Sequence, residues 1–148
     1  MKEKKQSSNA VLAIIIVALI GFFLYSHIKR LGERKISEPI QCHEFENSTI
    51  SEIYNENKNN EVLAREKYLG KSFNLSGVVE SVNYNEFTKD VYLMVQDGNV
   101  IAEVYLNYTQ DEISKTINSG DTINFCGTIE DLNPILGSAL NIDNAIIK

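Results

Sequence analysis

The stretch that decides the fold is NEVLAREKYLGKSFNLSGVVESV, residues 60–82. Its first part spaces apolar residues at helical intervals up to Tyr68, and Gly70 is a typical C-terminal stop for a helix. Residues 72–82 then alternate between apolar and polar, which predicts a long first strand. Gly77 lies at the middle of that strand, where a glycine lets it bend so that both halves pair within one barrel.

The segment before this strand is predicted to be an amphipathic helix over residues 49–70. Thr49 and Glu52 form a capping-box pattern, so the helix is expected to begin there. The asparagine-rich run at 55–60 weakens the pattern, because asparagine side chains compete for backbone hydrogen bonds. A break near residues 57–60 is therefore the alternative to one continuous helix.

Four more strands and one short helix are expected within a domain at residues 71–148. The strands cover residues 91–95, 100–106, 123–129 and about 139–147. Asp97-Gly98 lies between the first two of these and is a strong hairpin signal. Thr109 and Glu112 form a second capping box, which predicts a helix through Ile117. Three strands, a helix and two strands, with a bent first strand, is the order of an OB-fold, a five-stranded barrel.

Several short motifs between residues 60 and 127 also resemble a known family. The residues concerned are Asn60-Glu61, Ala64, Tyr68, Gly70-Lys71, Gly77-x-Val79 and Gly120-Asp121-x-Ile123-x-Phe125-x-Gly127. The first five motifs resemble the signature of the tRNA_anti-like family, and the last is similar to the fourth strand of many OB-folds. The resemblance covers roughly residues 50–147 and departs at the Asn-rich insert. It implies a bacterial OB-fold domain that is often membrane-anchored or a lipoprotein, brings no catalytic residues, and does not imply tRNA binding.

The beginning of the chain is predicted to anchor it in a membrane. Residues 1–9 form a basic tail, and residues 10–28 are almost wholly apolar. As a helix that run spans about 28 Å, close to the thickness of the hydrocarbon core. A cleaved signal peptide has a shorter apolar region, roughly 7–15 residues, and a small-residue exit. We therefore expect one uncleaved transmembrane helix.

The charges beside this helix bear on which side of the membrane the folded domain lies. Lysines and arginines balance on the two sides, so the positive-inside rule does not decide the orientation. The order of basic tail, apolar run and long folded domain favours a cytoplasmic amino terminus. The expected location is thus the bacterial inner (cell) membrane, with the C-terminal domain outside the cytoplasm.

Charge divides the chain into two parts. Residues 1–35 carry seven Lys/Arg against two Glu, whereas residues 36–148 carry seven Lys/Arg against eighteen Asp/Glu. Residues 36–148 therefore have a formal charge of -11, and residues 1–35 have a formal charge of +5. Lys and Arg contacts to phosphate supply most non-specific affinity for nucleic acid. Nucleic acid is accordingly an unlikely partner for this domain.

Residues 29–48 are predicted to be a linker, because they lack a steady period and contain Pro39. Cys42 lies in it, and Cys126 lies in the domain. In an oxidising compartment the two cysteines could pair and tie the linker to the barrel. Two separate thiols, with Cys126 packed at a strand, is the other interpretation, since spacing alone does not determine connectivity. The acidic residues around Cys42-His43 have no second cluster of ligands, so no metal or cofactor is expected.

Five aromatic residues are the candidate binding residues, because OB-folds usually bind through strands two and three and the loops beside them. They are Tyr84, Phe87, Tyr92, Tyr105 and Tyr108. Their alternative role is cross-strand packing, for which aromatics are common in strands. Between residues 72 and 147 only Lys89 and Lys115 are cationic, so a protein partner suits these aromatics better than a nucleic acid does.

Catalysis is not expected. Neither histidine lies in the barrel, and Ser76 and Ser81 have no nearby base. The sequence thus predicts a single-pass, membrane-anchored OB-fold binding module that engages a protein partner in the cell envelope. The alternative is a barrel that binds an oligosaccharide, a peptide or a single-stranded nucleic acid.

Overall fold

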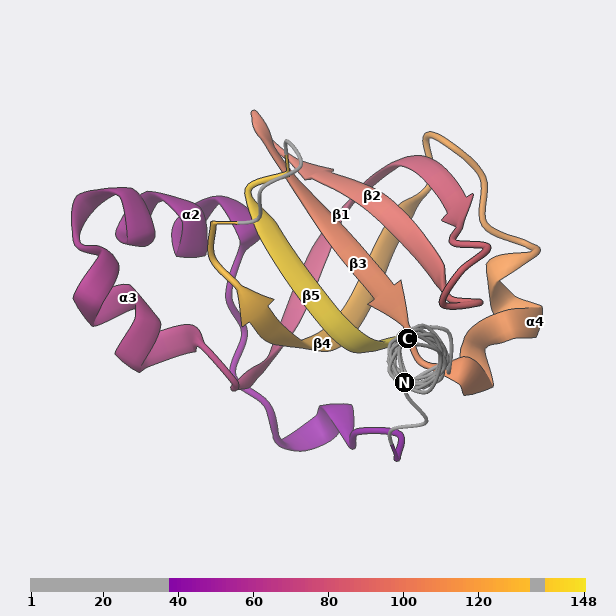
Figure 1. Ribbon diagram of the computed structural model, residues 1–148, viewed down its shortest axis with the longest axis horizontal. Coiled ribbons are helices and arrows are strands. Elements are labelled where there is room, and N and C mark those ends of the chain that lie inside the picture. The colour runs from indigo at the N-terminus through magenta and orange to yellow at the C-terminus, as the bar shows by residue number, and fades with distance from the viewer. Residues whose placement is uncertain (1–37, 134–137) are drawn as a thin grey trace, which may run out of the picture. The chain divides into compact units, whose positions relative to one another are not determined.

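The computed structural model describes residues 38–133 and 138–148 (Figure 1). The predicted basic tail, the predicted membrane helix at 10–28 and the first part of the linker lie outside the described residues. Among the residues that are described, no helix combines the length and apolar character needed to cross a membrane.

Five strands form a closed barrel in the order β1-β2-β3-β5-β4. They are β1 (Ser72–Tyr84), β2 (Val91–Asp97), β3 (Val100–Leu106), β4 (Thr122–Asp131) and β5 (Leu140–Ile147). Only the β3–β5 pair is parallel, and the other four pairs are antiparallel. The mainly β fold and the five-stranded closed barrel of the OB-fold prediction are therefore confirmed.

β1 serves both neighbours because it bends at its middle. Its first half, up to Val78, pairs with β4, and its second half, from Val78 to the end, pairs with β2. A Cβ built on Gly77 would lie 2.5 Å from Cγ1 of Val95 and 2.7 Å from the carbonyl oxygen of Gln96. Only glycine lets β2 approach this closely, so the residue closes the barrel at the bend.

The helical region before β1 is two helices, so the single helix over residues 49–70 is wrong and the alternative of a break near residues 57–60 is confirmed. They are α2 (Ile50–Asn59) and α3 (Glu61–Tyr68). Asn60 separates them with an extended backbone, and its side chain accepts a hydrogen bond from the N–H of Leu63 at 3.2 Å. An asparagine that caps the next helix in this way cannot continue the previous one. At the start of α2, the hydroxyl of Thr49 accepts from the N–H of Glu52 at 3.0 Å.

The helix expected from Thr109 through Ile117 is shorter in the structure. A 3-10 turn, η2 (Tyr108–Gln110), leads into α4 (Asp111–Ser114). Asn107 is the cap instead of Thr109, because its side-chain oxygen accepts both the N–H and the hydroxyl of Thr109, at 2.9 and 2.8 Å. Gln110 is the N-cap residue of α4, and it forms no side-chain cap hydrogen bond.

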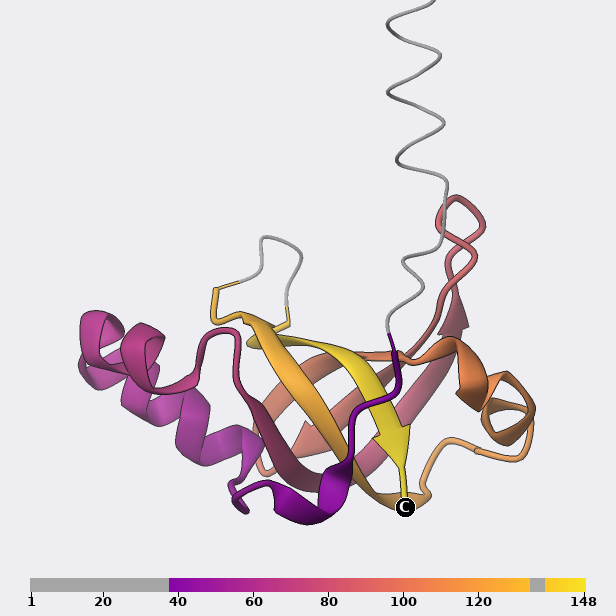
Figure 2. The ribbon, with the colours of Figure 1, turned by 90° about the horizontal axis from the view of Figure 1, so that it is seen from below.

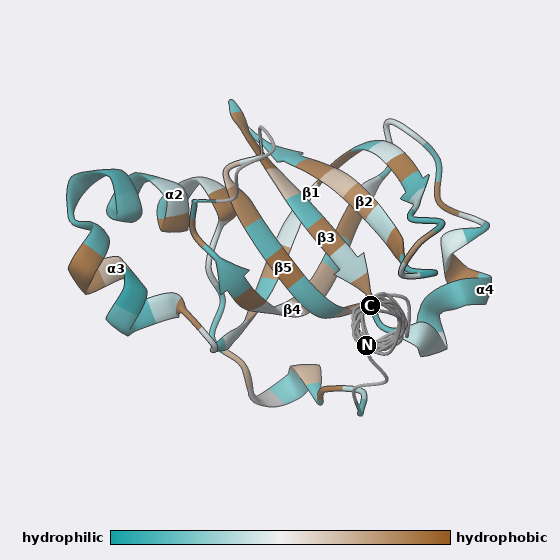
Figure 3. Ribbon diagram, viewed as in Figure 1, coloured by the Kyte–Doolittle hydropathy of each residue, from teal (hydrophilic) through white to brown (hydrophobic). Residues whose placement is uncertain are grey.

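The core lies inside the barrel and under α2. Apolar residues alternate with polar ones along the strands, as the brown and teal bands of β3 and β5 show (Figure 3). Ile50 and Ile53 of α2 are fully buried and join this core. α2 and α3 lie at one end of the barrel and α4 at the other (Figures 1 and 2). The outer surface of the strands between these ends is therefore where a binding site can form.

Candidate functional site

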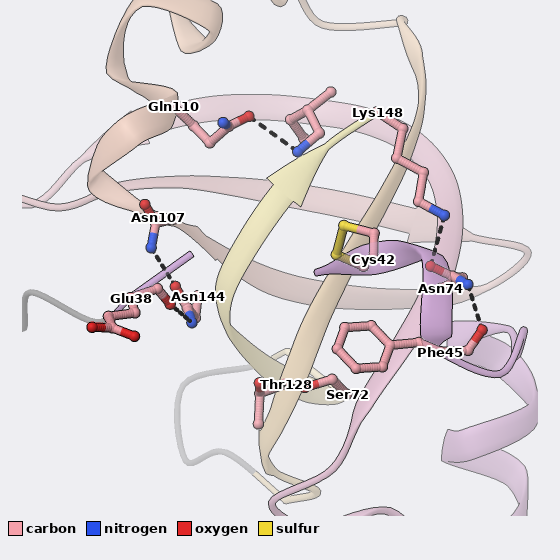
Figure 4. The surroundings of a disulfide bond; sticks show 12 residues. Glu38, Cys42, Phe45, Ser72, Asn74, Asn107, Gln110, Thr128, Asn144 and Lys148 are labelled. Carbon is pink, nitrogen blue, oxygen red and sulfur yellow. Dashed lines mark hydrogen bonds between the residues drawn. A yellow bond between two sulfur atoms is a disulfide. The ribbon is translucent and has the colours of Figure 1, made fainter. Parts of the chain in front are cut away.

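One part of the outer barrel surface is covered by the chain itself. Residues 38–48, here called the strap, include the 3-10 turn η1 (Cys42–Glu44). Cys42 forms a disulfide with Cys126 of β4, with the Cα atoms 5.6 Å apart (Figure 4). Phe125 and the other alternate residues of β4 fill the core, so Cys126 points outward. It is nevertheless fully buried, which places the strap over this part of β4.

Asn74 of β1 holds the strap through its backbone and its side chain. Its N–H donates to the carbonyl of Glu46 at 2.8 Å, and its own carbonyl accepts from the N–H of Ser48 at 3.0 Å. Its side-chain amide donates to the carbonyl of Phe45 at 2.6 Å, and Lys148 donates to its side-chain oxygen, also at 2.6 Å (Figure 4). The strap thus pairs as a short parallel bridge with β1.

Asn144 of β5 holds the beginning of the strap. Its side-chain amide donates to the carbonyl of Glu38 at 3.0 Å, and its side-chain oxygen accepts from Asn107 (Figure 4). Its φ is 55°, a left-handed conformation that asparagine tolerates better than most residues. The bonds of the strap therefore go to β1, β4 and β5, and the side of the barrel formed by these strands is occupied by the chain's own linker.

The outer face of β2 and β3 carries two of the predicted aromatics. Tyr92 and Tyr105 are directly opposite each other in the β2–β3 register, and their rings stack with centroids 5.2 Å apart and planes 22° apart. Both side chains are half-buried. Met94 and Glu103 form the next outward-facing pair of the same register. We call these four residues the tyrosine face.

Glu103 organises the polar part of the tyrosine face. The Tyr105 hydroxyl donates to one carboxylate oxygen at 3.1 Å, and the hydroxyl of Ser138 donates to the other at 3.2 Å. Burial, followed by the charge of Glu103 and its hydrogen bond, raises the pKa of Tyr105 to about 12, with Tyr92 and Asp90 contributing further. Tyr105 therefore stays a neutral donor well above physiological pH, and the Glu103 carboxylate is held in a fixed position.

This arrangement predicts how Tyr105 titrates. An NMR titration of the labelled tyrosine should give a pKa near 12, and Glu103→Gln should lower it while leaving it above the ordinary 10.0, because burial remains. The raised pKa stabilises the fold fully below pH 10, and this contribution is lost as the pH rises through about 12. An unchanged Tyr105 pKa in Glu103→Gln would show that the carboxylate does not act on the phenol.

The other three predicted aromatics lie at the end of the barrel near α4. Tyr84 ends β1, Phe87 lies in the β1–β2 loop and Tyr108 begins η2. Their exposed fractions are 56%, 86% and 40%. Tyr84 pairs with Val91, one position from Tyr92, so its side chain lies on the opposite face of the hairpin. The structure therefore brings Tyr92 and Tyr105 together and leaves the other three as separate exposed aromatics.

The charged side chains of the five barrel strands are all acidic. None of the five strands contains a lysine or an arginine, and together they contain six carboxylates. The carboxylates are Glu80, Asp97, Glu103, Glu130, Asp131 and Asp143. Several cations elsewhere pair with nearby acids, such as Lys67 of α3 with Glu56 of α2 at 2.8 Å and Lys115 with Glu112 of α4 at 2.6 Å. The barrel surface thus presents negative charge to a partner.

Two further features bear on what the site can do chemically. Within residues 38–133 and 138–148, no three His, Cys, Asp or Glu side chains gather as metal ligands would. A groove of about 530 Å³ lies beside the strap and is lined by Asn47, Ser48, Thr49, Asn74, Leu75, Ser76, Asn124 and Lys148. Its described lining contains no His, Cys, Asp or Glu side chain.

Sequence reasoning missed Glu103, Ser138 and Asn74. Glu103 and Ser138 are 35 residues apart, and Asn74 bonds a strap whose position depends on the disulfide. The alternation of β3 places Glu103 and Tyr105 on the same face, and this was the one available signal.

Comparisons with known proteins found a matching family and solved structures with a similar fold. A model of the tRNA_anti-like family matches residues 1–139. A search of the curated proteins found no match. A proposed nucleic acid-binding lipoprotein from Klebsiella pneumoniae is similar in structure, with a TM-score of 0.56 and 13% identity over 69% of this chain and 92% of that one.

Two synthetases are similar over a smaller share of their own length. An aspartyl-tRNA synthetase from Entamoeba histolytica has a TM-score of 0.50 and 11% identity over 78% of this chain and 24% of that one. A proposed aspartyl-tRNA synthetase from Leishmania major has a TM-score of 0.51 and 11% identity over 86% and 25%. This chain spans about a quarter of each synthetase. At such identities the likeness shows the fold alone.

Proposed function

Because the chain belongs to the tRNA_anti-like family, we propose that its OB-fold domain is a binding module that engages a protein partner in the cell envelope and performs no catalysis. The tyrosine face is the proposed binding surface, whereas Tyr84, Phe87 and Tyr108 do not belong to it.

The observation that carries this proposal is the stacked pair of Tyr92 and Tyr105 on the outer face of β2 and β3. Tyrosine is enriched at protein interfaces and among the residues that contribute most to binding. The pair is held in position by its stacking and by Glu103, so little side-chain entropy is lost on binding. A rigid, half-buried aromatic pair suits a protein surface.

The proposed location is outside the cytoplasm, next to a bacterial cell membrane. The apolar run at 10–28 supports a single membrane span. The disulfide supports an oxidising compartment, because disulfides persist there and are rare in the cytosol. A reporter fused after Lys148 that is active only outside the cytoplasm tests this orientation, and its silence would reverse it.

Single-stranded nucleic acid is the second candidate, since OB-folds can stack bases on aromatic side chains. The name of the Klebsiella pneumoniae lipoprotein favours it. The charge of the strands opposes it, because a phosphate backbone meets six carboxylates and no cation there. Anisotropy titrations with single-stranded DNA and RNA at low salt separate the two functions. Micromolar binding that weakens steeply with salt would favour nucleic acid over a protein partner.

Truncating the tyrosine pair is expected to abolish partner capture. Crosslinking in native membranes, followed by purification of the full chain and mass spectrometry, should identify proteins that are lost with Tyr92→Ala and Tyr105→Ala. Leu63→Ala, which removes an exposed apolar side chain from α3, is the control and should retain them. We expect at least a tenfold loss for each tyrosine, since central interface residues often contribute about 2 kcal/mol or more. Equal capture by all variants would refute the proposed surface.

A further inference from the structure

The charge and the aromatic rings of the tyrosine face together indicate the chemistry of its partner. We propose that this face binds a segment of a partner protein that presents arginine or lysine side chains. The inference rests on the proposed function and adds to it the chemical class of the ligand.

Acidic side chains lie in and next to the tyrosine face. Glu103 lies within it, and Asp90 directly precedes β2 and contributes to the raised pKa of Tyr105. The only lysine or arginine in the described loop between β1 and β2 is Lys89, and no cation lies in β2 or β3 themselves. A partner with positive charge is therefore favoured by complementarity, while an acidic partner is repelled.

The Glu103 carboxylate is held in position by two hydrogen bonds. Each of its oxygens already accepts one hydrogen bond, from Tyr105 and from Ser138. A carboxylate oxygen has two lone pairs, so each oxygen can accept one more hydrogen bond. A guanidinium can supply two parallel N–H groups to such an anchored carboxylate, and this pairing is stronger than a neutral hydrogen bond.

A pair of stacked aromatic rings lies next to that carboxylate. Tyr92 and Tyr105 are half-buried, and their stacked planes are 22° apart. A guanidinium attracted to an aromatic ring also forms hydrogen bonds in its own plane, which an ammonium cannot do to the same extent. Rings and carboxylate together thus favour arginine over lysine, and both over neutral side chains.

The test uses a fluorescently labelled glycine-rich peptide that contains three arginines, and the same peptide with citrulline, which is neutral, in their place. Anisotropy with the full chain in detergent should show that the arginine peptide binds and the citrulline peptide binds at least tenfold more weakly. Glu103→Gln should weaken arginine-peptide binding about fivefold, as the loss of a partly exposed charge pair predicts. The control Glu130→Gln removes the same charge from an exposed position on β4 and should change it less than twofold.

Equal weakening by Glu103→Gln and Glu130→Gln would overturn the proposal, because it would show that only net charge matters. Equal binding of the arginine and citrulline peptides would also overturn it. If Tyr92→Ala abolishes capture of a membrane protein while peptide affinity does not depend on Glu103, the proposed function stands and this inference fails. If Tyr92→Ala changes neither, both fail.

Discussion

Removing the disulfide between Cys42 and Cys126 is expected to lower the free energy of unfolding by about 2–4 kcal/mol. The two cysteines are 84 residues apart, so the bond closes a long loop and strongly restricts the unfolded chain. Cys42→Ala is the suitable variant, since Cys126 is fully buried and its replacement would also disturb packing. Urea unfolding of the two proteins, with and without reductant, measures the difference.

The reductant should shift the unfolding midpoint of the natural chain and leave that of Cys42→Ala unchanged. Amide exchange at Asn74 and Ser48 should accelerate in the variant, because their hydrogen bonds alone then hold the strap. Equal midpoints for both proteins would contradict the stabilising role of the bond. Unchanged exchange at these amides would show that the strap is held without it.

Gly77→Val is expected to destabilise the barrel by about 3 kcal/mol, at the upper end of the usual cost of overpacking. Its Cβ would lie 2.5 Å from Cγ1 of Val95 and 2.7 Å from the backbone oxygen of Gln96. The Val95 side chain can rotate, but the backbone oxygen can move only if β1 and β2 separate. The cost therefore falls on the pairing of Val78 with Gln96, at the point where β1 changes partners.

Chemical unfolding measures this cost, and Ser76→Ala, an exposed neighbour on the same strand, is the control. Gly77→Ala should fall between the control and Gly77→Val, since it adds the clash without the branched methyl groups. If Gly77→Val were as stable as the control, the close approach of β1 and β2 would not be needed for barrel closure.

The barrel could be predicted from the sequence because its signals are local. Alternation, the Asp97-Gly98 turn and the bend at Gly77 each depend on a few neighbouring residues. The helices were harder to predict from the sequence. The asparagine run indicated a break but did not identify Asn60 as the residue that caps α3. Asn107 caps η2 and accepts from both the N–H and the hydroxyl of Thr109, and the capping-box pattern of Thr109 and Glu112 did not indicate this.

The candidate site depends on long-range register, and this limits its prediction. The aromatics could be named, but the stacking of Tyr92 on Tyr105 follows from the pairing of β2 with β3. The disulfide between Cys42 and Cys126 was one of two interpretations of the sequence, and the structure shows it. The sequence alone left it open, because the pairing depends on the distance between segments 84 residues apart. The strap matters for function because it occupies one side of the barrel and so distinguishes the two outer faces.

Site-specific photocrosslinking tests most directly whether the tyrosine face meets a partner. A benzophenone amino acid in place of Met94 lies on this face, and the same amino acid in place of Asn124 lies on the strap side of β4. Illuminated membranes should yield a crosslinked protein from position 94 and none from position 124. Crosslinks from position 124 alone would contradict the account and assign the partner to the other side of the barrel.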